Sequence, residues 1–261
     1  SLTTGLIQGP PKVLIIVENL PVPLDRRVWQ EARALRAAGW DVTVICPMRQ
    51  AYTKAYEEID QIKIYRHKPF EGKRALGFLL EYRAALFPEL RLAIKVFRRD
   101  GFDVVHACNP PDLIFLVALP FRLIGKKFVF DHHDLCPELF TAKFGRRGAF
   151  YWALRGFEWL TFKLANLVIS ANDTYRDIAI ARGGKKPGDV VAVYSVPDRK
   201  WTTNAKRERE PHRRLVIGYV GIVAAQDGVD HLIRATRWIL DSGRMNVQTV
   251  IVGDGPALVA T

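Results

Sequence analysis

Short apolar, β-branched runs alternate with amphipathic segments along most of the chain. Residues 12–17 (KVLIIV) predict a strand buried on both faces, and residues 26–38 carry apolar side chains at helical spacing. Asp25 is placed to cap that helix at its start, and Gly39 is placed to end it. Residues 41–46 (DVTVIC) predict the next strand. Such strand–helix–strand units build parallel sheets.

The same alternation continues to about residue 194. Further strands are predicted at 103–107, 126–131, 166–170 and 189–194, and further helices at 112–124, 148–164 and 173–182. A Rossmann-like, doubly wound parallel α/β sheet is the fold that this order favours.

A charged stretch without apolar periodicity interrupts the pattern at residues 198–213, which predict a linker. Residues 1–197 are therefore expected to form an N-terminal Rossmann-like domain. Residues 214–261 restart the pattern, with a helix near 228–241 between two strands. Because so short a unit cannot cover both faces of a parallel sheet, we expect an incomplete second Rossmann-like domain.

Composition places the chain among ordinary globular proteins, with 49% apolar and 25% charged residues. Its three cysteines (Cys46, Cys108 and Cys136) are widely spaced, which disfavours a disulfide framework or a structural cysteine zinc site and favours a reducing, cytoplasmic setting. No apolar run approaches the ~20 residues of a membrane span, and we expect no signal peptide.

The net charge of +12 is concentrated in residues 61–214, which carry 29 basic and 16 acidic side chains. This excess indicates a surface for phosphates, anionic lipid or nucleic acid. Nucleic acid is the weakest of the three, because the aromatic residues fall in apolar helical stripes instead of an exposed strand face.

Polar residues and prolines gather at the ends of three of the predicted strands. They are Glu18, Asn19 and Pro21 after the first; His106, Asn109, Pro110, Pro111 and Asp112 around the end of strand 103–107; and DHHDLCPE (131–138) at the end of strand 126–131. Ligands of open α/β sheets bind beyond the carboxyl ends of the strands, so these loops are expected to share one rim. Neither GxGxxG nor GxxxxGK[ST] is present, which argues against a plain dinucleotide site and a P-loop.

Three interpretations of DHHD stand side by side. His132 and His133 are adjacent and point to opposite faces of a strand, so a shared metal ion needs an irregular loop and a third ligand such as His106. Alternatively, Asp131 and Asp134 cap a turn and the histidines bond to the backbone. The third interpretation, a polar site in which one histidine and Glu138 touch a substrate, is the one we favour.

The ordered motifs resemble family 4 glycosyltransferases. They are KVLIIVENLPVPLDRRVWQEARALRAAGWDVTVICP, FDVVHACNPPD, FDHHDLCPELF, RGGKKPGDVVAVYSVPD, GYVGIVAAQDGVDHLIRA and VIVGDGP, and together they extend from Lys12 to Pro256. The resemblance implies a retaining, metal-independent enzyme of the GT-B fold that uses a nucleotide sugar as substrate and needs no cofactor. It also implies that the first domain binds the acceptor and the second binds the donor.

The resemblance assigns roles to particular residues. His133 is the implied catalytic histidine, with Asp134 and Glu138 orienting it or touching the acceptor. The implied acceptor-binding residues are Asn19, Pro21, Arg26, His106, Asn109 and Asp112, and the implied donor-binding residues are Gly221, Asp227, Gly228, Gly253 and Gly255. No metal ligands are implied.

Two departures from the family pattern concern the site. A glycine of many relatives is replaced by Val196 in the segment Ser195–Asp198, which reshapes a turn. Residues 221–230 also contain no cation, although many relatives hold the donor diphosphate with basic residues there. Backbone amides or residues further along are then needed for the diphosphate.

Two amphipathic stretches, 74–98 and 144–163, place cations beside apolar stripes. The cations concerned are Arg91, Lys95, Arg98, Arg146 and Arg147. Packed helices with a solvated basic face are one interpretation, and docking on the anionic inner face of a membrane is the other.

The predicted activity is the transfer of a sugar from a nucleotide sugar to a glycan or lipid-linked acceptor with retention of configuration. A non-catalytic polyanion-binding module and a sugar-nucleotide epimerase of the related two-domain fold are the alternatives. Because a cleft needs both walls, we expect the 261-residue chain alone to be inactive.

Overall fold

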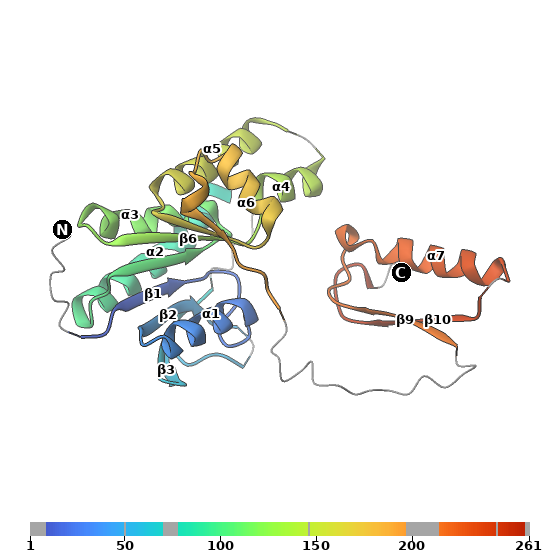
Figure 1. Ribbon diagram of the computed structural model, residues 1–261, viewed down its shortest axis with the longest axis horizontal. Coiled ribbons are helices and arrows are strands. Elements are labelled where there is room, and N and C mark those ends of the chain that lie inside the picture. The colour runs from blue at the N-terminus through green and yellow to red at the C-terminus, as the bar shows by residue number, and fades with distance from the viewer. Residues whose placement is uncertain are drawn as a thin grey trace. The chain divides into compact units, whose positions relative to one another are not determined.

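The computed structural model describes residues 9–49, 51–69, 78–145, 147–196, 214–243 and 245–258, with side chains for all of these except 78–85, 143 and 226. The chain forms two compact units, residues 1–196 and residues 197–261 (Figure 1). The linker predicted at 198–213 lies outside the described residues.

The larger unit is built on an eight-stranded sheet with the order β3-β4-β2-β1-β5-β6-β7-β8. The strands are β1 (Lys12–Ile16), β2 (Asp41–Pro47), β3 (Tyr56–Ile59), β4 (Ile62–His67), β5 (Val104–Cys108), β6 (Lys127–His132), β7 (Leu167–Ser170) and β8 (Val190–Ala192). Every neighbouring pair is parallel except β3 and β4. The predicted doubly wound, parallel α/β fold is confirmed.

Helices cover both faces of this sheet. They are α1 (Arg26–Ala37), α2 (Phe78–Arg99), α3 (Phe115–Leu123), α4 (Cys136–Phe144), α5 (Ala149–Leu164) and α6 (Asp173–Ala181), with short 3-10 turns at Asp112–Ile114 and Pro187–Asp189. Side chains of β1 alternate between two apolar clusters: Leu14 and Ile16 pack with residues of α2, α3 and α5, whereas Val13 and Ile15 pack with residues of α1. This two-sided burial explains why β1 is a continuous apolar run.

The start of α1 follows the predicted cap. Oδ1 of Asp25 accepts a hydrogen bond from the backbone N–H of Val28 at 3.1 Å. The residue at the other end, Gly39, has φ of 86°, a left-handed conformation that glycine adopts without strain. The cap therefore fixes where α1 begins, directly after the loop that leaves β1.

Two features were missed by the sequence analysis. The hairpin of β3 and β4 closes through Asp60 and Gln61, which both have positive φ, and its outer strand alternates exposed and half-buried side chains. Such a half-polar edge strand has little apolar signal. Helix α4, inside the DHHDLCPELF segment, begins with Pro137 in its first turn and ends at Gly145 with φ of 67°.

The smaller unit consists of β9 (Leu215–Val220), α7 (Val229–Asp241) and β10 (Val247–Val252), with a 3-10 turn at Ala225–Asp227. β9 and β10 pair in parallel from Leu215 opposite Val247 to Val220 opposite Val252. The unit is the predicted strand–helix–strand element.

The order of the sheet reverses at β1, because β2 lies on one side of it and β5 on the other. Loops leaving β1 and β5 diverge at such a switch point, which is where ligands of open α/β sheets bind. Residues after β1, β5 and β6 therefore share this edge.

Candidate active site

The two histidines after β6 point in different directions, as strand alternation predicts. His132 is fully buried, and its ring packs 5.5 Å from Phe130, 5.1 Å from Phe162 and 5.3 Å from Tyr175, measured between ring centroids. Burial in this aromatic pocket, followed by the charge of Arg182, lowers the pKa of His132 to about 3. His132 is thus a neutral core residue.

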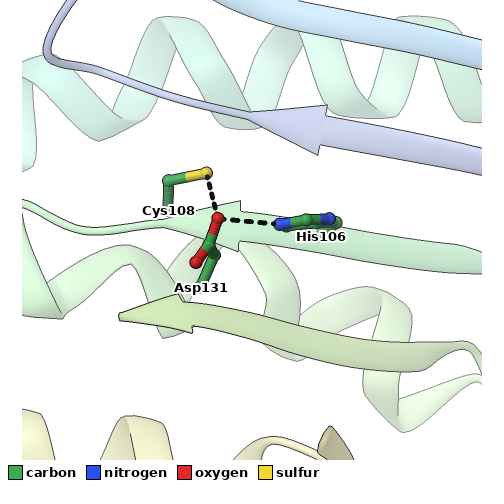
Figure 2. A group of neighbouring side chains, drawn as sticks. All are labelled: His106, Cys108 and Asp131. Atoms are coloured by element: carbon green, nitrogen blue, oxygen red, sulfur yellow. Dashed lines mark hydrogen bonds and ion pairs between the residues drawn. The ribbon is translucent and has the colours of Figure 1, made fainter. Parts of the chain in front are cut away.

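On the opposite side, Asp131 is the centre of a charged network. Its carboxylate, which is fully buried, accepts from Nη2 of Arg27 at 2.9 Å and lies 2.7 Å from Nε2 of His133. Nε2 of His106 lies 3.3 Å away and Sγ of Cys108 lies 3.8 Å away from the same oxygen, Oδ2 (Figure 2). The network joins α1, β5 and β6.

The groups around Asp131 decide the charge of its carboxyl group. Burial by itself raises the pKa of Asp131, but the nearby imidazoles of His133 and His106 outweigh burial and hold that pKa well below its usual range. Asp131 is therefore an ionised carboxylate with its charge compensated on several sides.

The proton on His133 can be placed. Nε2 of His133 lies 2.7 Å from Oδ2 of Asp131 and 3.1 Å from Nε of Arg27. A carboxylate only accepts and a guanidinium only donates, so Nε2 cannot serve both. The shorter contact puts the hydrogen on Nε2, facing Asp131. Burial lowers the pKa of His133, but Asp131 outweighs it, and the net pKa is raised.

Nδ1 of His133 is then the ring nitrogen that remains for a substrate. The side chain is 16% exposed, in contrast to the fully buried Asp131 behind it. A partly exposed imidazole backed by a buried carboxylate is an arrangement used in acid–base and hydrogen-bonding sites.

A second carboxyl group, Glu31 of α1, lies beside the network. Its oxygens are 3.3 Å from Nε of Arg27 and 3.6 Å from Nε2 of His106. Burial, followed by the charge of Asp131, raises the pKa of Glu31 to about 7. Glu31 therefore changes charge near neutral pH, next to an aspartate that does not.

The loop after β5 is held by Asn109. Its Oδ1 accepts from the backbone N–H groups of His133 (2.7 Å) and Asp134 (3.1 Å), and its Nδ2 donates to Asp112 and to the carbonyl of Asp134, both at 2.7 Å. These bonds place the backbone of His133 directly.

Three residues predicted to bind the acceptor, His106, Asn109 and Asp112, are buried, with at most 4% of each residue's surface exposed. His106 contacts Asp131, and Asn109 bonds to Asp112 within the loop after β5. Contact of these residues with an acceptor stays a prediction.

The partner of His133 also differs from the expectation. Asp131, not Asp134 or Glu138, makes the close contact with its imidazole. Glu138 lies in the first turn of α4 and pairs with Arg182 at 2.5 Å, and Arg182 also binds the buried Glu158 at 2.5 Å. Glu138 therefore ties α4 to α5 and α6. The backbone N–H of Asp134 donates to Asn109, and burial raises the pKa of the Asp134 side chain.

Of the residues predicted after β1, Asn19 is exposed and Pro21 is buried, with its carbonyl accepting from the N–H of Asp25. Arg26 is exposed on the first turn of α1, whereas its neighbour Arg27 enters the network. Nη1 of Arg27 further donates to the carbonyl of Val193 at 2.7 Å and lies 3.3 Å from Oγ of Ser195. Arg27 thus links α1, β6 and the segment after β8.

Arg27 and Glu31 were not among the residues predicted for the site, and Asp131 was predicted only to cap a turn. The available signal was the spacing of four residues between Arg27 and Glu31, which puts both on one helix face. That face borders a cavity of about 170 Å³ lined by Arg27, Gln30, Glu31, Ala34, Val193, Tyr194 and Ser195.

In the smaller unit, the glycines predicted to bind the donor let two loops approach closely. A Cβ on Gly253 would lie 1.8 Å from the carbonyl oxygen of Gly221, and one on Gly255 would lie 2.3 Å from that of Val223. Gly228 has φ of 66° at the start of α7. Oδ2 of Asp227 accepts from the N–H of Ala224 at 3.0 Å. All five predicted residues thus shape the turns after β9 and β10.

The predicted membrane-facing cations of α2 are exposed. Arg91, Lys95 and Arg98 line a cavity of about 930 Å³ together with apolar side chains of the same helix. Arg147 lies with its guanidinium carbon 5.4 Å from the ring centroid of Tyr151, and Arg146 lies outside the described residues. Among the helices described, none is both long and apolar enough to cross a membrane.

Comparison with known proteins gives a family match. The family model described as Glycosyltransferase Family 4 matches residues 24–198. A chitobiosyldiphosphodolichol beta-mannosyltransferase from Candida glabrata is 24% identical over 180 residues, which is 66% of this chain and 39% of that protein. The chain therefore spans well under half the length of that relative.

Solved structures share the fold at low sequence identity. The catalytic domain of starch synthase IV from Arabidopsis thaliana, bound to ADP and acarbose, has a TM-score of 0.60 and 15% identity, with 95% of this chain and 69% of that chain covered. A putative UDP-N-acetylglucosamine 2-epimerase from Listeria monocytogenes has a TM-score of 0.58 and 17% identity, with 93% and 62% covered. Both likenesses concern the fold alone, which is that of GT-B proteins.

Proposed function

This chain belongs to glycosyltransferase family 4, and from that premise we propose that it forms the acceptor-binding unit and part of the donor-binding unit of a retaining glycosyltransferase. The proposed reaction moves a sugar from a nucleotide sugar to a glycan or lipid-linked acceptor without a metal or cofactor. The observation that carries the proposal is the pairing of partly exposed His133 with buried Asp131 at the carboxyl edge of the sheet.

His133 is the proposed catalytic residue. Its Nε2–H is committed to Asp131, so Nδ1 is the atom that meets the substrate. The raised pKa of His133 favours the imidazolium form, whose Nδ1–H can donate to a sugar hydroxyl or to negative charge that develops at the reacting centre. Asp131 maintains that proton and the orientation of the ring without contacting substrate.

The nucleotide sugar is proposed to bind at the turns after β9 and β10. The close approach of Gly253 to Gly221 brings the two backbone turns together, so that N–H groups of both turns can face one ligand. Because residues 221–230 carry no cation, the proposal gives the diphosphate to backbone N–H groups.

The acceptor is proposed to be lipid-linked and the enzyme to work at the cytoplasmic face of a membrane. The exposed cations Arg91, Lys95 and Arg98 beside apolar side chains of α2 support this location. The relative from Candida glabrata is named for the transfer of mannose to a dolichol diphosphate-linked acceptor, which agrees with the same class.

The test uses protein in which this chain continues into a complete second unit. A panel of UDP- and GDP-linked sugars is offered with a polyprenyl diphosphate-linked sugar, and the anomeric configuration of the product is read by NMR, with and without EDTA. Transfer with retention in EDTA supports the proposal, and inversion or a strict metal requirement contradicts it.

The same assay separates the alternatives. Epimerised or hydrolysed nucleotide sugar without acceptor would indicate an epimerase, a class that shares the fold. Tight binding of polyanions with no turnover of any donor would indicate a binding module. Either result overturns the proposed transfer.

A further inference from the structure

A second buried polar cluster lies away from His133, where β1, β4 and α2 meet. It consists of half-buried Glu18, two residues past the end of β1, with buried His67 at the end of β4 and buried Glu89 on α2, and we call it the Glu18–His67–Glu89 cluster. One nitrogen or oxygen of each side chain lies within 4.8 Å of the corresponding atoms of the other two. None of these side chains takes part in the network around Asp131.

The tautomer of His67 follows from its neighbours. Nδ1 lies 3.1 Å from the backbone carbonyl oxygen of Lys68. A carbonyl only accepts, so Nδ1 carries the hydrogen and a neutral ring presents a lone pair at Nε2. That atom lies 3.1 Å from Oε2 of Glu18, so the imidazole and the carboxylate face each other across a gap that a proton or a metal ion can bridge.

Glu89 adds a third group of the same kind. Its side chain is fully buried, and neither carboxyl oxygen has a hydrogen-bond partner among the residues that the structure describes. A carboxylate without hydrogen-bond donors is unfavourable in so buried a place. A buried acid with both oxygens unpaired requires a proton or a cation.

The Asp131 network shows what the second cluster lacks. Around Asp131, the guanidinium of Arg27 donates to the carboxylate, and the ring nitrogens of His106 and His133 contact the same group. The guanidinium of Arg66, the residue before His67, is directed elsewhere: it pairs with Glu57 at 2.6 Å and donates to the carbonyl of Val22 at 2.7 Å. Arg66 thus gives no hydrogen bond to Glu18 or Glu89.

We propose that the Glu18–His67–Glu89 cluster binds one divalent transition-metal ion, with Zn²⁺ as the best match. One imidazole nitrogen and two carboxylate oxygens form a set that zinc accepts, and three protein ligands leave a fourth position open. The Nδ1–H bond of His67 to a backbone carbonyl is the outer contact that fixes a zinc-binding histidine. Two carboxylates and a divalent ion are electrically neutral together.

The ion has a route from solvent and a structural consequence. His67 also lines the cavity of about 930 Å³ beside α2, which gives an entry path. Bound there, the metal cross-links two strand ends and a helix, and it fixes Glu18 immediately before the loop of Asn19 and Pro21. The site is separate from His133, so it does not rest on the proposed transfer reaction.

The test is metal binding by the 261-residue chain itself. Chain stripped with a chelator and dialysed is titrated with Zn²⁺ by calorimetry, and zinc after gel filtration is counted by mass spectrometry. We expect one Zn²⁺ per chain, a raised Tm with zinc, and a visible spectrum of four-coordinate Co²⁺ when cobalt replaces zinc. Glu89→Gln and His67→Gln should each weaken zinc binding by at least about a hundredfold, since outer-shell changes alone cost 10–100-fold.

Two matched variants separate this site from adventitious zinc. Glu58→Gln on the exposed face of β3 and His231→Ala on the exposed side of α7 should keep full stoichiometry. Retention of one zinc by both cluster variants would place the ion elsewhere and overturn the proposal. Failure of the wild-type chain to bind zinc would also overturn the proposal, whether or not the variants fold. In that case Glu89 would be paired through a proton shared with its neighbours instead of through a metal ion.

Discussion

Oδ2 of Asp131 lies 2.7 Å from Nε2 of His133, so a fully buried carboxylate backs the only partly exposed imidazole of the DHHD segment. The two residues are two positions apart on one strand end and therefore point to the same side of the sheet. His132 between them points into the aromatic core. One position along the chain thus separates a histidine packed in the core from a partly exposed histidine beside Asp131.

The first prediction concerns these two histidines. In protein with a complete second unit, His133→Ala should lower turnover by about 10²–10³ while the fold is kept, because one hydrogen bond to the transition state is lost. His132→Ala should mainly destabilise, by about 2–5 kcal/mol as for other large-to-small core changes. Turnover and urea unfolding of both variants are compared. Loss of turnover in His132→Ala and loss of stability in His133→Ala would contradict the assignment of His132 to the core and of His133 to the site.

The second prediction tests the link between Asp131 and His133 in the chain itself. Asp131→Asn removes the charge that raises the pKa of His133, so that pKa should fall. A titration of the His133 ring protons by NMR measures it directly. An unchanged pKa in a folded variant would contradict the placement of the proton on Nε2.

The third prediction compares neighbouring arginines. Arg27→Ala leaves Asp131 without its guanidinium, and breaking such a buried pair costs about 3–5 kcal/mol. Arg26→Ala, on the exposed side of the same turn, should change stability by less than about 0.5 kcal/mol. Denaturant unfolding of both variants is the measurement, and equal losses would count against the network.

The fourth prediction is a pH dependence at Asp112. Burial raises its pKa to about 7 from an ordinary 3.8, so the folded chain keeps a proton that the unfolded chain has lost between those values. The contribution of Asp112 to the free energy of unfolding is therefore present at low pH and is lost as the pH rises toward 7. Asp112→Asn removes the titration, and its stability relative to wild type should improve by up to about 1.4 kcal/mol per pH unit between pH 5 and pH 7.

Urea unfolding at pH 5, 6 and 7 measures that trend. Asp177→Asn, at a side chain that is 76% exposed, is the control and should run parallel to wild type. Glu31 titrates in the same direction, so wild type and control are both expected to lose stability over this range. A constant difference between Asp112→Asn and wild type would contradict the buried acid.

The fifth prediction concerns the membrane surface. Vesicles with anionic lipid should retain the chain at low salt and release it at high salt, because each exposed cation contributes on the order of 1 kcal/mol and salt screens it. Reversal of charge at Arg91, Lys95 and Arg98 together should abolish retention, whereas reversal at exposed Arg33 of α1 should not. Equal retention on neutral and anionic vesicles would show that these residues form an ordinary solvated helix face and do not bind anionic lipid.

Periodicity was enough to predict the parallel sheet and most helices, because β1, β2 and β6 are buried on both faces and carry continuous apolar runs. The β3–β4 hairpin escaped notice, since Glu57 and Glu58 interrupt its apolar pattern. The split between His132 and His133 followed from strand geometry.

The partners of His133 did not follow from local sequence. Arg27 lies 106 positions before His133, and only the packing of α1 against the end of β6 brings the two together. Asn109 was predicted to bind an acceptor, and its side-chain oxygen and nitrogen are both used in hydrogen bonds to Asp112, His133 and Asp134. These bonds depend on tertiary packing, which local sequence does not show.

The two sheets differ in how well their edges are protected against aggregation. The edge strands of the eight-stranded sheet, β3 and β8, have only four and three residues. β3 also carries Glu57 and Glu58, which discourage another chain from adding a strand. β9 and β10 are six residues each and expose Val216, Val220 and Val252. Intermolecular strand addition in a concentrated preparation of this chain would therefore begin at residues 215–252, and charged substitutions there are the first remedy for poor solubility.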